Sequence, residues 1–403
     1  MTYTIRFLPH DKTVEVKENT RLIKAAMDAG VHINASCGGE GVCGKCRILI
    51  EQGEIEGGIS EHLSEEDQSQ GYRLACVSRI KSDITVRIPI ESEVDTSRLN
   101  VQAGARHTAE AMDFNVDELR QEGLFIPPVE KIYLEMSEAT KDDHQADLAR
   151  IVDHLRTHHD EHRLMTNLNL IRKVPDIIRE QDFKVTVTII RPVREDGKNE
   201  IVNIEPGDTT DRNFGIAVDI GTTTIYGQVI DLQTGEPLGQ HGEFNAQISY
   251  GEDVISRIMF ATKGDGLEVL HERVMDTINK VIARIVKKAG IDKDEITTIT
   301  LAGNTTMTQL LLKINPKYIR LAPYVPASIF FPPFHASEVG IDLNDHAVAL
   351  FYPGVSSYVG GDIIAGVMAS GMYREEALTL FMDIGTNAEI VIGNKDWMVC
   401  TAA

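Results

Sequence analysis

The stretch Cys37-Gly-Gly-Glu-Gly-Val-Cys43-Gly-Lys-Cys46 decides the fold of the N-terminal part of the chain. It places cysteines at C-x5-C-x2-C spacing in a glycine-rich loop, and Cys76 follows in Arg73-Leu-Ala-Cys76. Iron–sulfur clusters are held by thiolates, and plant-type [2Fe–2S] proteins use C-x4-C-x2-C plus a distant cysteine. Glycines let the backbone wrap closely around such a cluster. The motif predicts a [2Fe–2S] cluster with Cys37, Cys43, Cys46 and Cys76 as metal ligands.

Two other readings of these cysteines remain open, a structural zinc site and a disulfide pair. Structural zinc sites usually pair two C-x2-C knuckles, and this motif contains one. The chain has 403 residues and five cysteines, which fits a reducing, cytoplasmic location. It has no signal-peptide pattern and no long apolar run, so no membrane partner is expected. The net charge of −21 argues against nucleic acid as a partner.

Residues 1–93 have the element order of a β-grasp [2Fe–2S] ferredoxin-like domain. We expect strands at 2–8, 13–16, 45–51 and 83–89. A helix is expected at 21–29, with Thr20 as its cap and Gly30 at its end. Ser60 and Ser64 are candidate caps of a short acidic helix.

The next two segments show little chemistry. Residues 94–124 are interpreted as a linker, and residues 125–207 as a small α/β middle domain with a spacing or docking role. Strands are expected at 131–136, 183–190 and 200–205, and helices at 145–158 and 168–179, the second broken at Pro175. His154, His158 and His162 recur at helical spacing, which fits either a metal site or a solvated helix face.

From about residue 208 to 403 the chain carries an internal repeat. Asp219-Ile-Gly221-Thr222-Thr223-Thr224 follows one apolar run, and Asp383-Ile-Gly385-Thr386-Asn387 follows another. A hairpin turn of glycine and threonine presents N–H groups and hydroxyls to a phosphate, and aspartate holds Mg²⁺ through its waters. Two such hairpins predict a clamp for a nucleoside triphosphate. A P-loop motif is absent from the sequence.

Two further small-residue turns lie between the hairpins. They are Gly303-Asn304-Thr305-Thr306 and Gly360-Gly361-Asp362, each at the expected start of a helix. Helix N-termini with small residues suit anions or metal-bound water. The alternative is simple capping, with Thr305 and Asp362 as N-caps.

These motifs resemble the superfamily of acetate and sugar kinases, heat-shock chaperones and actin. With a [2Fe–2S] domain in front, the chain resembles the ATP-dependent reductive activators of corrinoid proteins. The resemblance implies a multidomain α/β and α+β fold that ends in an actin-like (ribonuclease H-like) ATPase domain. It implies reduction of Co(II) to Co(I) in a corrinoid protein or corrinoid-dependent methyltransferase, with electrons from an upstream donor. A homodimer is implied for the full-length protein.

The resemblance also assigns residue roles. It implies that Asp219 and Asp383 act in ATP hydrolysis with Mg²⁺, and that the residues which bind the ATP phosphates are Gly221, Thr222, Thr223, Gly385 and Thr386. From their place in the small-residue turns we add Asp362 as a catalytic candidate, and as nucleotide-binding candidates Thr224, Gly303, Asn304, Gly361 and Asn387. The chain ends directly after the second hairpin, so we expect an incomplete ATPase domain, with Cys400 as a buried small hydrophobe.

Two other functions stay open. One is a ferredoxin-type electron carrier whose degenerate nucleotide domain serves only for docking. The other is a sugar or acid kinase with an appended cluster, although no base for a substrate hydroxyl stands out.

Overall fold

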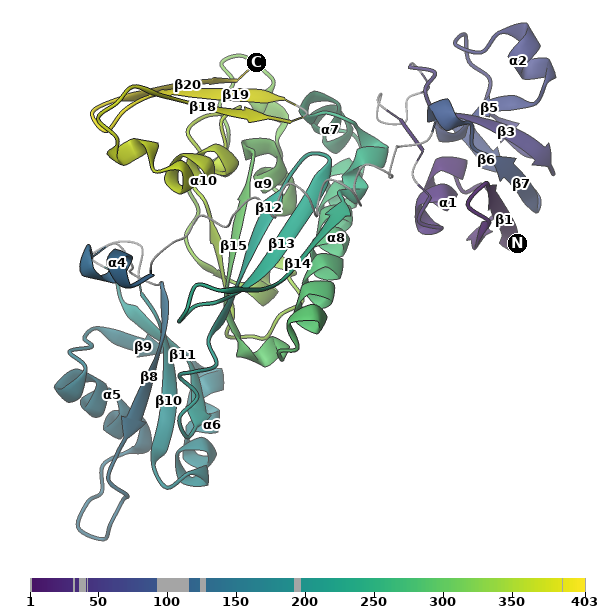
Figure 1. The fold of residues 1–403 in the computed structure, drawn as a ribbon. Helices are drawn as coiled ribbons and strands as arrows, with labels where there is room; N and C mark the ends of the chain where they lie inside the picture. The colour runs from purple at the N-terminus through teal and green to yellow at the C-terminus, as the bar shows by residue number, and fades with distance from the viewer. Residues whose placement is uncertain are drawn as a thin grey trace.

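The computed structural model describes residues 2–31, 33–35, 41, 43–92, 116–123, 128–191, 197–385 and 387–402. In chain order they form a ferredoxin unit, a middle unit and a C-terminal unit, which is called the ATPase unit after the resemblance given above (Figure 1). The ferredoxin and middle units lie on opposite sides of the ATPase unit in this view.

The ferredoxin unit is built on a five-stranded sheet of order β2-β1-β7-β3-β5. β1 and β2 form an antiparallel hairpin, and β1 pairs in parallel with β7. The strands are β1 (Thr2–Leu8), β2 (Lys12–Lys17), β3 (Arg47–Gln52), β5 (Tyr72–Leu74) and β7 (Ile84–Arg87), beside a two-stranded pair of β4 (Ile55–Gly57) and β6 (Ser78–Ile80). This is the β-grasp arrangement that the sequence predicts.

Two helices accompany this sheet, α1 (Leu22–Asp28) and α2 (Glu65–Ser69). The apolar side chains of α1 face the sheet, and Leu22 of this helix therefore packs in one core with Phe7 and Ile48. Ser64 caps α2 by accepting from the amide of Asp67, as predicted. The predicted Thr20 cap is wrong, since its hydroxyl donates to the Lys17 carbonyl.

The middle unit has a four-stranded sheet of order β8-β10-β11-β9. Its elements are β8 (Val129–Glu135), α5 (Asp147–His158), β9 (Leu164–Thr166), α6 (Leu168–Glu180), β10 (Lys184–Ile190) and β11 (Asn199–Pro206), preceded by α4 (Val116–Gln121). Contrary to prediction, α6 continues through Pro175. The carbonyl that loses its partner there belongs to Ile171, which is exposed, so water can replace the missing amide. Most of the predicted linker lies outside the described residues.

The ATPase unit contains a six-stranded sheet of order β14-β13-β12-β15-β17-β16. β12, β15 and β17 run parallel, while β13 and β14 fold back as antiparallel neighbours. The strands are β12 (Phe214–Ile220), β13 (Thr224–Asp231), β14 (Pro237–Phe244), β15 (Ile296–Gly303), β16 (Phe334–His335) and β17 (Val348–Phe351). This mixed sheet is the actin-like, ribonuclease H-like order.

Helices cover this sheet and position its loops. The long helix α8 (Gly266–Ala289) packs across β13 and β14, and its apolar side chains fill the core (Figure 1). The other helices are α7 (Val254–Ala261), α9 (Thr305–Leu311) and α10 (Gly361–Ser370). α9 begins just after Gly303, which pairs with Ile220 of β12, and the start of α10 packs against Asn304, so both N-termini lie close to the first hairpin.

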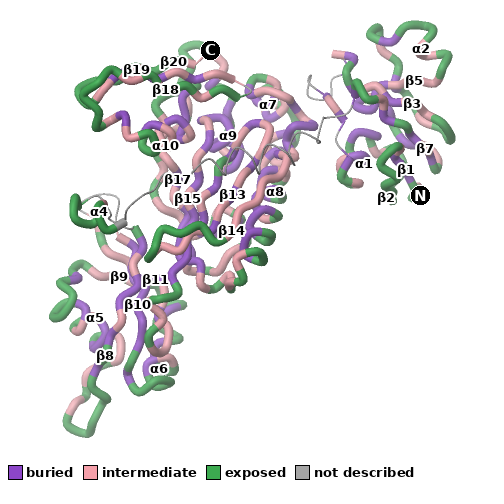
Figure 2. Tube along the Cα trace, in the orientation of Figure 1, coloured by how far each residue is buried: buried purple, intermediate pink, exposed green. Residues whose placement is uncertain are grey.

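A separate three-stranded sheet of order β18-β19-β20 completes the described chain. It consists of β18 (Thr379–Ile384), β19 (Ala388–Gly393) and β20 (Met398–Ala402). Leu380, Met382 and Ile384 are exposed on one face of β18, and the sheet is coloured largely as exposed and intermediate in Figure 2. Cys400 is exposed on the edge strand β20, so its predicted burial is wrong.

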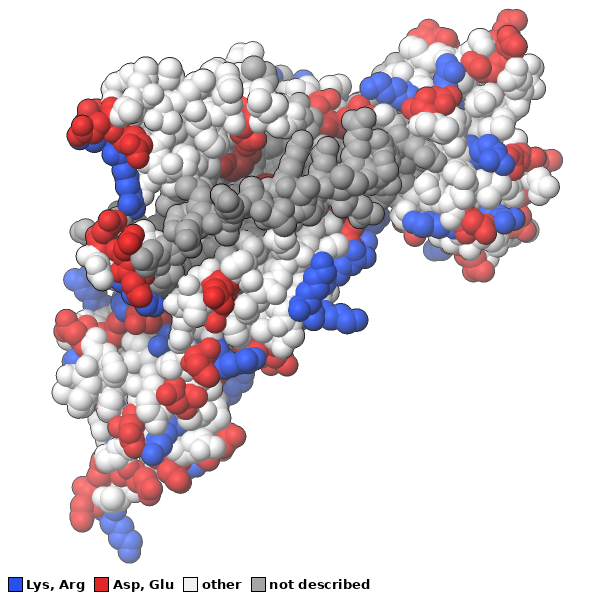
Figure 3. All heavy atoms as spheres, in the orientation of Figure 1, with Lys and Arg blue, Asp and Glu red and all other residues white. Residues whose placement is uncertain are grey.

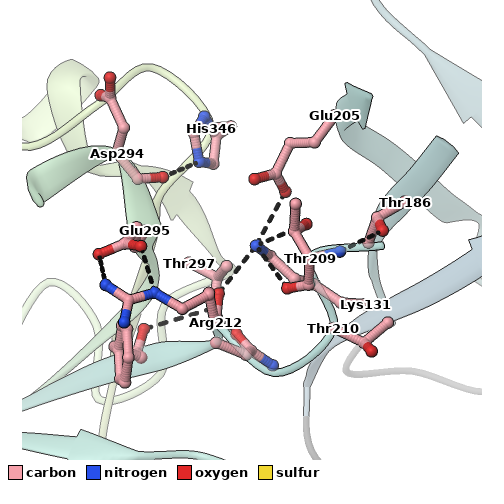
Figure 4. Close-up of polar contacts among 12 residues, drawn as sticks. Lys131, Thr186, Glu205, Thr209, Thr210, Arg212, Asp294, Glu295, Thr297 and His346 are labelled. Carbon is pink, nitrogen blue, oxygen red and sulfur yellow. Dashed lines mark hydrogen bonds and ion pairs between the residues drawn. The ribbon is translucent and has the colours of Figure 1, made fainter. Parts of the chain in front are cut away.

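The middle and ATPase units share a buried polar junction (Figure 4). Lys131 Nζ lies 2.8 Å from Glu205 Oε2 and donates to the Arg212 carbonyl at 2.8 Å. Arg212 in turn forms a two-pronged pair with Glu295. Beside it, side chains of the middle unit pack against Val348 of β17 in one apolar cluster. The two units are therefore joined by a desolvated contact.

The ferredoxin unit meets the ATPase unit through two partly exposed ion pairs. Lys45 Nζ lies 3.2 Å from Glu252 Oε2, and Asp28 lies 3.9 Å from Arg273. Ion pairs near the surface contribute about 0–1 kcal/mol each. These pairs therefore hold the ferredoxin unit only weakly.

None of the helices that the structure describes is long and apolar enough to cross a membrane.

Candidate iron–sulfur and nucleotide sites

The cysteine loop brings two of the predicted cluster ligands into contact. Cys46 and Cys76 are buried, and their Sγ atoms lie 3.2 Å apart. A disulfide would need about 2.05 Å, whereas two thiolates on one tetrahedral metal at about 2.3 Å are separated by about 3.7 Å. Contact with Cys76 lowers the pKa of the Cys46 thiol to about 7, although burial opposes it. The pair is thus predisposed to bind metal.

The other two predicted cluster ligands are Cys43 and Cys37. Cys43 is half-buried in the same loop, and Cys37 lies outside the described residues. Gly44 has a positive φ of 68°, and a Cβ there would lie 2.7 Å from His62. Glycine is therefore required between Cys43 and Cys46 for the loop to turn.

The first hairpin loop, residues 221–224, directs its backbone carbonyl groups toward Asn245 and Arg257. Asn245 Nδ2 donates to the Gly221 carbonyl at 2.9 Å, and the Asn245 amide donates to the Thr223 carbonyl at 2.9 Å. The Thr222 carbonyl accepts from Arg257 Nη2. Because C=O and the next N–H point in opposite directions across a planar peptide, the amides that follow face away from this network. The N–H groups of these peptides therefore lie on the side of the loop opposite Asn245 and Arg257.

Arg257 is the fully buried centre of this support. Its Nε donates to the Gly251 carbonyl at 2.9 Å, and its Nη1 to Gln247 Oε1 at 3.1 Å. Burial lowers the pKa of Arg257 to about 9, which leaves the guanidinium charged at neutral pH. A buried cation bound mainly to neutral acceptors adds positive potential beneath the loop.

The second turn bonds directly to the first hairpin. Asn304 Nδ2 donates to Thr222 Oγ1 at 3.2 Å, and Asn304 Oδ1 caps α9 by accepting from the Met307 amide at 2.9 Å. The cap is therefore Asn304 and not Thr305. Its two roles are compatible, since the amide group holds the hairpin while the carbonyl oxygen holds the helix.

The third turn approaches so closely that only glycine fits. A Cβ at Gly360 would lie 2.4 Å from Asn304 Cα, and one at Gly361 would lie 2.6 Å from the Tyr352 carbonyl. Gly360 is the N-cap position of α10, which places Asp362 inside the first turn and corrects the predicted Asp362 cap. This placement directs the Asp362 carboxylate toward the other acids of the cleft.

The second hairpin matches the first in sequence but differs in geometry. Asp383 pairs across the strands with Glu389, whereas Asp219 pairs with Tyr226. The loop between the paired strands is also one residue shorter in the second hairpin. Asn387 lies in this loop, and Thr386 falls outside the described residues. The two hairpins are therefore related in sequence but differ in loop length and in the residue that stands opposite the aspartate.

Four carboxylates converge between the hairpins, and the sequence analysis missed one of them, Glu389. Burial, then the charges of Asp362 and Asp383, raise the pKa of Asp219 to about 7. The same causes raise the pKa of Glu389 to about 7. Asp219 keeps some solvent exposure at the open side of the cleft, but the protein around its carboxyl removes much of its hydration, and the neighbouring acids add to this effect. Such a cluster requires a cation or protons.

A cavity of about 380 Å³ adjoins this cluster, and Glu389 is the member of the cluster that lines it. It is lined on one side by Asn304 and Thr306 and on the other by Asn387 and Glu389. Acidic atoms are visible in the hollow between the β18–β20 sheet and the rest of the unit (Figure 3). The volume is within the range of small-molecule pockets.

The residues present fit Mg²⁺ held through water. Within the described ranges, no group of three or more His, Cys, Asp or Glu side chains is placed to hold a metal directly. Mg²⁺ keeps several waters and is commonly bound through one or two carboxylates plus phosphates. Asp219 and Asp383 are the residues that would hold those waters.

The three histidines predicted at helical spacing do not converge on one point, because α5 ends at His158 and His162 lies beyond it. His154 and His158 stack with ring centroids 4.2 Å apart, while His162 pairs with Asp160 at 2.9 Å. His154 and His158 are therefore stacked together, whereas His162 is paired with a carboxylate outside the helix.

Four family models match consecutive parts of the chain. Residues 5–81 match the 2Fe-2S iron-sulfur cluster binding domain, and 118–211 match the RACo linker region. Residues 214–375 match the RACo middle region, and 377–403 match the C-terminal domain of RACo, the ASKHA domain. The folded middle unit therefore corresponds to the region that the family models call a linker.

Relatives match over nearly the whole chain. A solved structure described as a reductive activator for corrinoid, iron-sulfur protein is 37% identical with a TM-score of 0.65, covering 99% of this chain and 63% of its own. The corrinoid activation enzyme RamQ of Eubacterium limosum is 27% identical over 96% of this chain and 58% of its own length. A component of the Na(+)-translocating NADH-quinone reductase of Idiomarina loihiensis is 31% identical over 83 residues, 20% of each chain. The chain thus spans about three fifths of the long relatives.

Proposed function

Because this chain belongs to the family of reductive activators of corrinoid proteins, we propose that it reduces a corrinoid protein in an ATP-dependent reaction. Cobalt in the partner would gain one electron and pass from Co(II) to Co(I), the state that accepts a methyl group. The observation that carries the proposal is one chain with both a cysteine loop and a cluster of carboxylates between two phosphate-type hairpins.

The cysteine loop supports the electron-transfer half of the proposal. Cys37, Cys43, Cys46 and Cys76 would hold a [2Fe–2S] cluster, which supplies a one-electron carrier between an upstream donor and the cobalt. The short Cys46–Cys76 distance and the lowered pKa of Cys46 favour thiolates at this place.

The hairpins support the nucleotide half. The amides of residues 222–224 would bind ATP phosphates, and Asn304 and Asn387 would contact them from the cavity wall. Asp219 and Asp383 would orient the waters of Mg²⁺, and Asp362 would orient the water that attacks the terminal phosphate. Gly221, Gly303, Gly361, Gly385 and Thr386 complete the proposed site.

The setting of the reaction is part of the proposal. We infer a cytoplasmic protein that works as a homodimer in its full-length form. Its partners would be a corrinoid protein or corrinoid-dependent methyltransferase and an upstream one-electron donor.

The test is the appearance of the Co(I) absorption band in a Co(II) corrinoid protein mixed with this chain and a strong reductant. We expect the band to require ATP and to be lost in Cys43→Ala and in Asp219→Asn. Reduction that is indifferent to ATP, with an intact cluster spectrum, would instead favour the electron carrier with a docking domain. No reduction with or without ATP would contradict both functions.

A further inference from the structure

The buried Arg257 network connects two places that the proposed function keeps separate. One is the phosphate loop, whose Thr222 carbonyl accepts from Arg257 Nη2. The other is the Gly251 carbonyl, which accepts from Arg257 Nε at 2.9 Å. The residue after Gly251 is Glu252, the partner of Lys45 on the ferredoxin unit.

The ferredoxin end of this connection lies at the cluster. Lys45 is adjacent in sequence to Cys46, a proposed cluster ligand. Its ammonium is 3.2 Å from Glu252 Oε2, with roughly half of the Lys45 side chain exposed. A small displacement of Glu252 would therefore change how firmly the cluster loop is held against the ATPase unit.

The segment between the two ends is rigid. A Cβ at Gly251 would lie 2.5 Å from Ser256 Oγ and 2.8 Å from the backbone nitrogen of Arg257. The backbone at Gly251 therefore packs tightly on the start of α7. Asp253 caps α7 by accepting from the Ser256 amide at 2.9 Å. Arg257 Nη1 also contacts Met307 Sδ of α9 at 3.0 Å. These close contacts leave little free volume around the segment in which a shift of the phosphate loop could be absorbed.

We propose that Arg257 is a positioning residue which couples phosphate binding at loop 221–224 to the docking of the ferredoxin unit at Glu252. This inference rests on the proposed nucleotide function. An anion on the loop amides polarises the Thr222 carbonyl and strengthens its bond to Arg257. Arg257 then holds Gly251 and Glu252 in the orientation that pairs with Lys45. ATP would in this way favour the docked ferredoxin unit.

The first test is zero-length cross-linking with a carbodiimide, which joins an ammonium and a carboxylate that are in contact. The Lys45–Glu252 amide is counted by mass spectrometry in the full chain, with its cluster, with and without Mg²⁺–ATP. We expect ATP to raise the yield about twofold or more, at the low end of allosteric couplings because the pair is exposed.

Two arginine variants distinguish coupling through Arg257 from a general effect of replacing an arginine by lysine. Arg257→Lys keeps the charge but cannot reach the same acceptors, so the yield should no longer respond to ATP. Arg284→Lys makes the same change at an exposed arginine of α8 and should respond like the unmodified protein. Direct measurement of ATP binding accompanies both.

A second measurement does not depend on the folding of an Arg257 variant. Coupling between sites is reciprocal, so Glu252→Lys should weaken Mg²⁺–ATP binding about twofold or more. The charge swap Lys45→Glu with Glu252→Lys should restore it. A merely structural effect of Glu252→Lys would not be rescued by the second change.

The outcomes separate this inference from the proposed function. If the unmodified chain binds Mg²⁺–ATP with a constant cross-link yield and the charge swap restores nothing, the coupling is wrong and the proposed function stands. If it does not bind Mg²⁺–ATP at all, the nucleotide site is wrong and the coupling is overturned with it.

Discussion

Asp383 and Glu389 stand directly opposite each other across the antiparallel strands β18 and β19. Two like charges in this register repel by about 0.2–1 kcal/mol. A proton or a cation between the two carboxylates would remove this repulsion. The register of its strands therefore gives the second hairpin a demand for a positive ligand.

Replacement of Glu389 by glutamine tests this demand. Glu389→Gln should raise the free energy of unfolding of the ligand-free protein by about 0.2–1 kcal/mol, because the repulsion disappears. The same change should weaken Mg²⁺–ATP binding. Thermal unfolding and equilibrium binding measure the two effects. Glu376→Gln, at an exposed glutamate that pairs with Lys395, serves as the matched control and should do neither.

The acid cluster also predicts how stability depends on pH. Unfolded Asp and Glu titrate near 4, whereas the folded pKa values of Asp219, Asp362 and Glu389 are raised to about 7, 6 and 7. The folded state then holds more protons between these limits, so this contribution to stability falls as pH rises from about 4 to 7.

The measurement is the melting temperature of the ligand-free protein at pH 5 and pH 8, compared with that of Asp362→Asn. The decrease in melting temperature should be smaller in the variant, and saturating Mg²⁺–ATP should reduce it in the unmodified chain. An equal decrease in both proteins would contradict a role for the cluster.

The close contact between two turns gives a steric prediction. Gly360→Ala places a Cβ 2.4 Å from Asn304 Cα, a backbone atom that cannot move without displacing the Asn304–Thr222 bond. We expect a loss of about 1–3 kcal/mol in unfolding free energy, typical of overpacking. Gly385→Ala has its nearest neighbour at 3.8 Å and should change stability by less than about 0.5 kcal/mol. Denaturant titration distinguishes the two.

The cysteines give a prediction about cluster content. Cys76→Ala removes one of the two sulfurs in contact and should abolish the visible spectrum and most of the bound iron after reconstitution. Cys400→Ala is the control, because Cys400 is exposed on β20 and should leave both unchanged. Retention of the spectrum in Cys76→Ala would mean that the fourth ligand is a different residue.

The parts that could be predicted from the sequence are those in which chemistry demands a residue type. The cysteine spacing and the Asp-Ile-Gly-Thr repeat are of this kind, and they point to a ferredoxin fold and an actin-like sheet. Glu389 was not found because its role arises from strand register: a loop one residue shorter puts it opposite Asp383.

Other residues were missed or misjudged because tertiary context decides them. Arg257 looks like an ordinary polar residue at a helix start, and only the fold brings the carbonyls of Gly251 and Thr222 to it. Pro175 was expected to break α6, but solvent at Ile171 removes the cost. Cys400 was expected inside, but it lies on an edge strand.

The junction at Lys131 has a calorimetric consequence. Lys131 is almost completely buried; its ammonium pairs with Glu205 inside the middle unit and donates across the junction to the Arg212 carbonyl. The middle and ATPase units cannot separate there without breaking that hydrogen bond and exposing the apolar cluster around Val348 to water. The ferredoxin unit, held by exposed pairs, carries no such penalty. Scanning calorimetry should therefore record one endotherm for the joined units and a separate one for the ferredoxin unit.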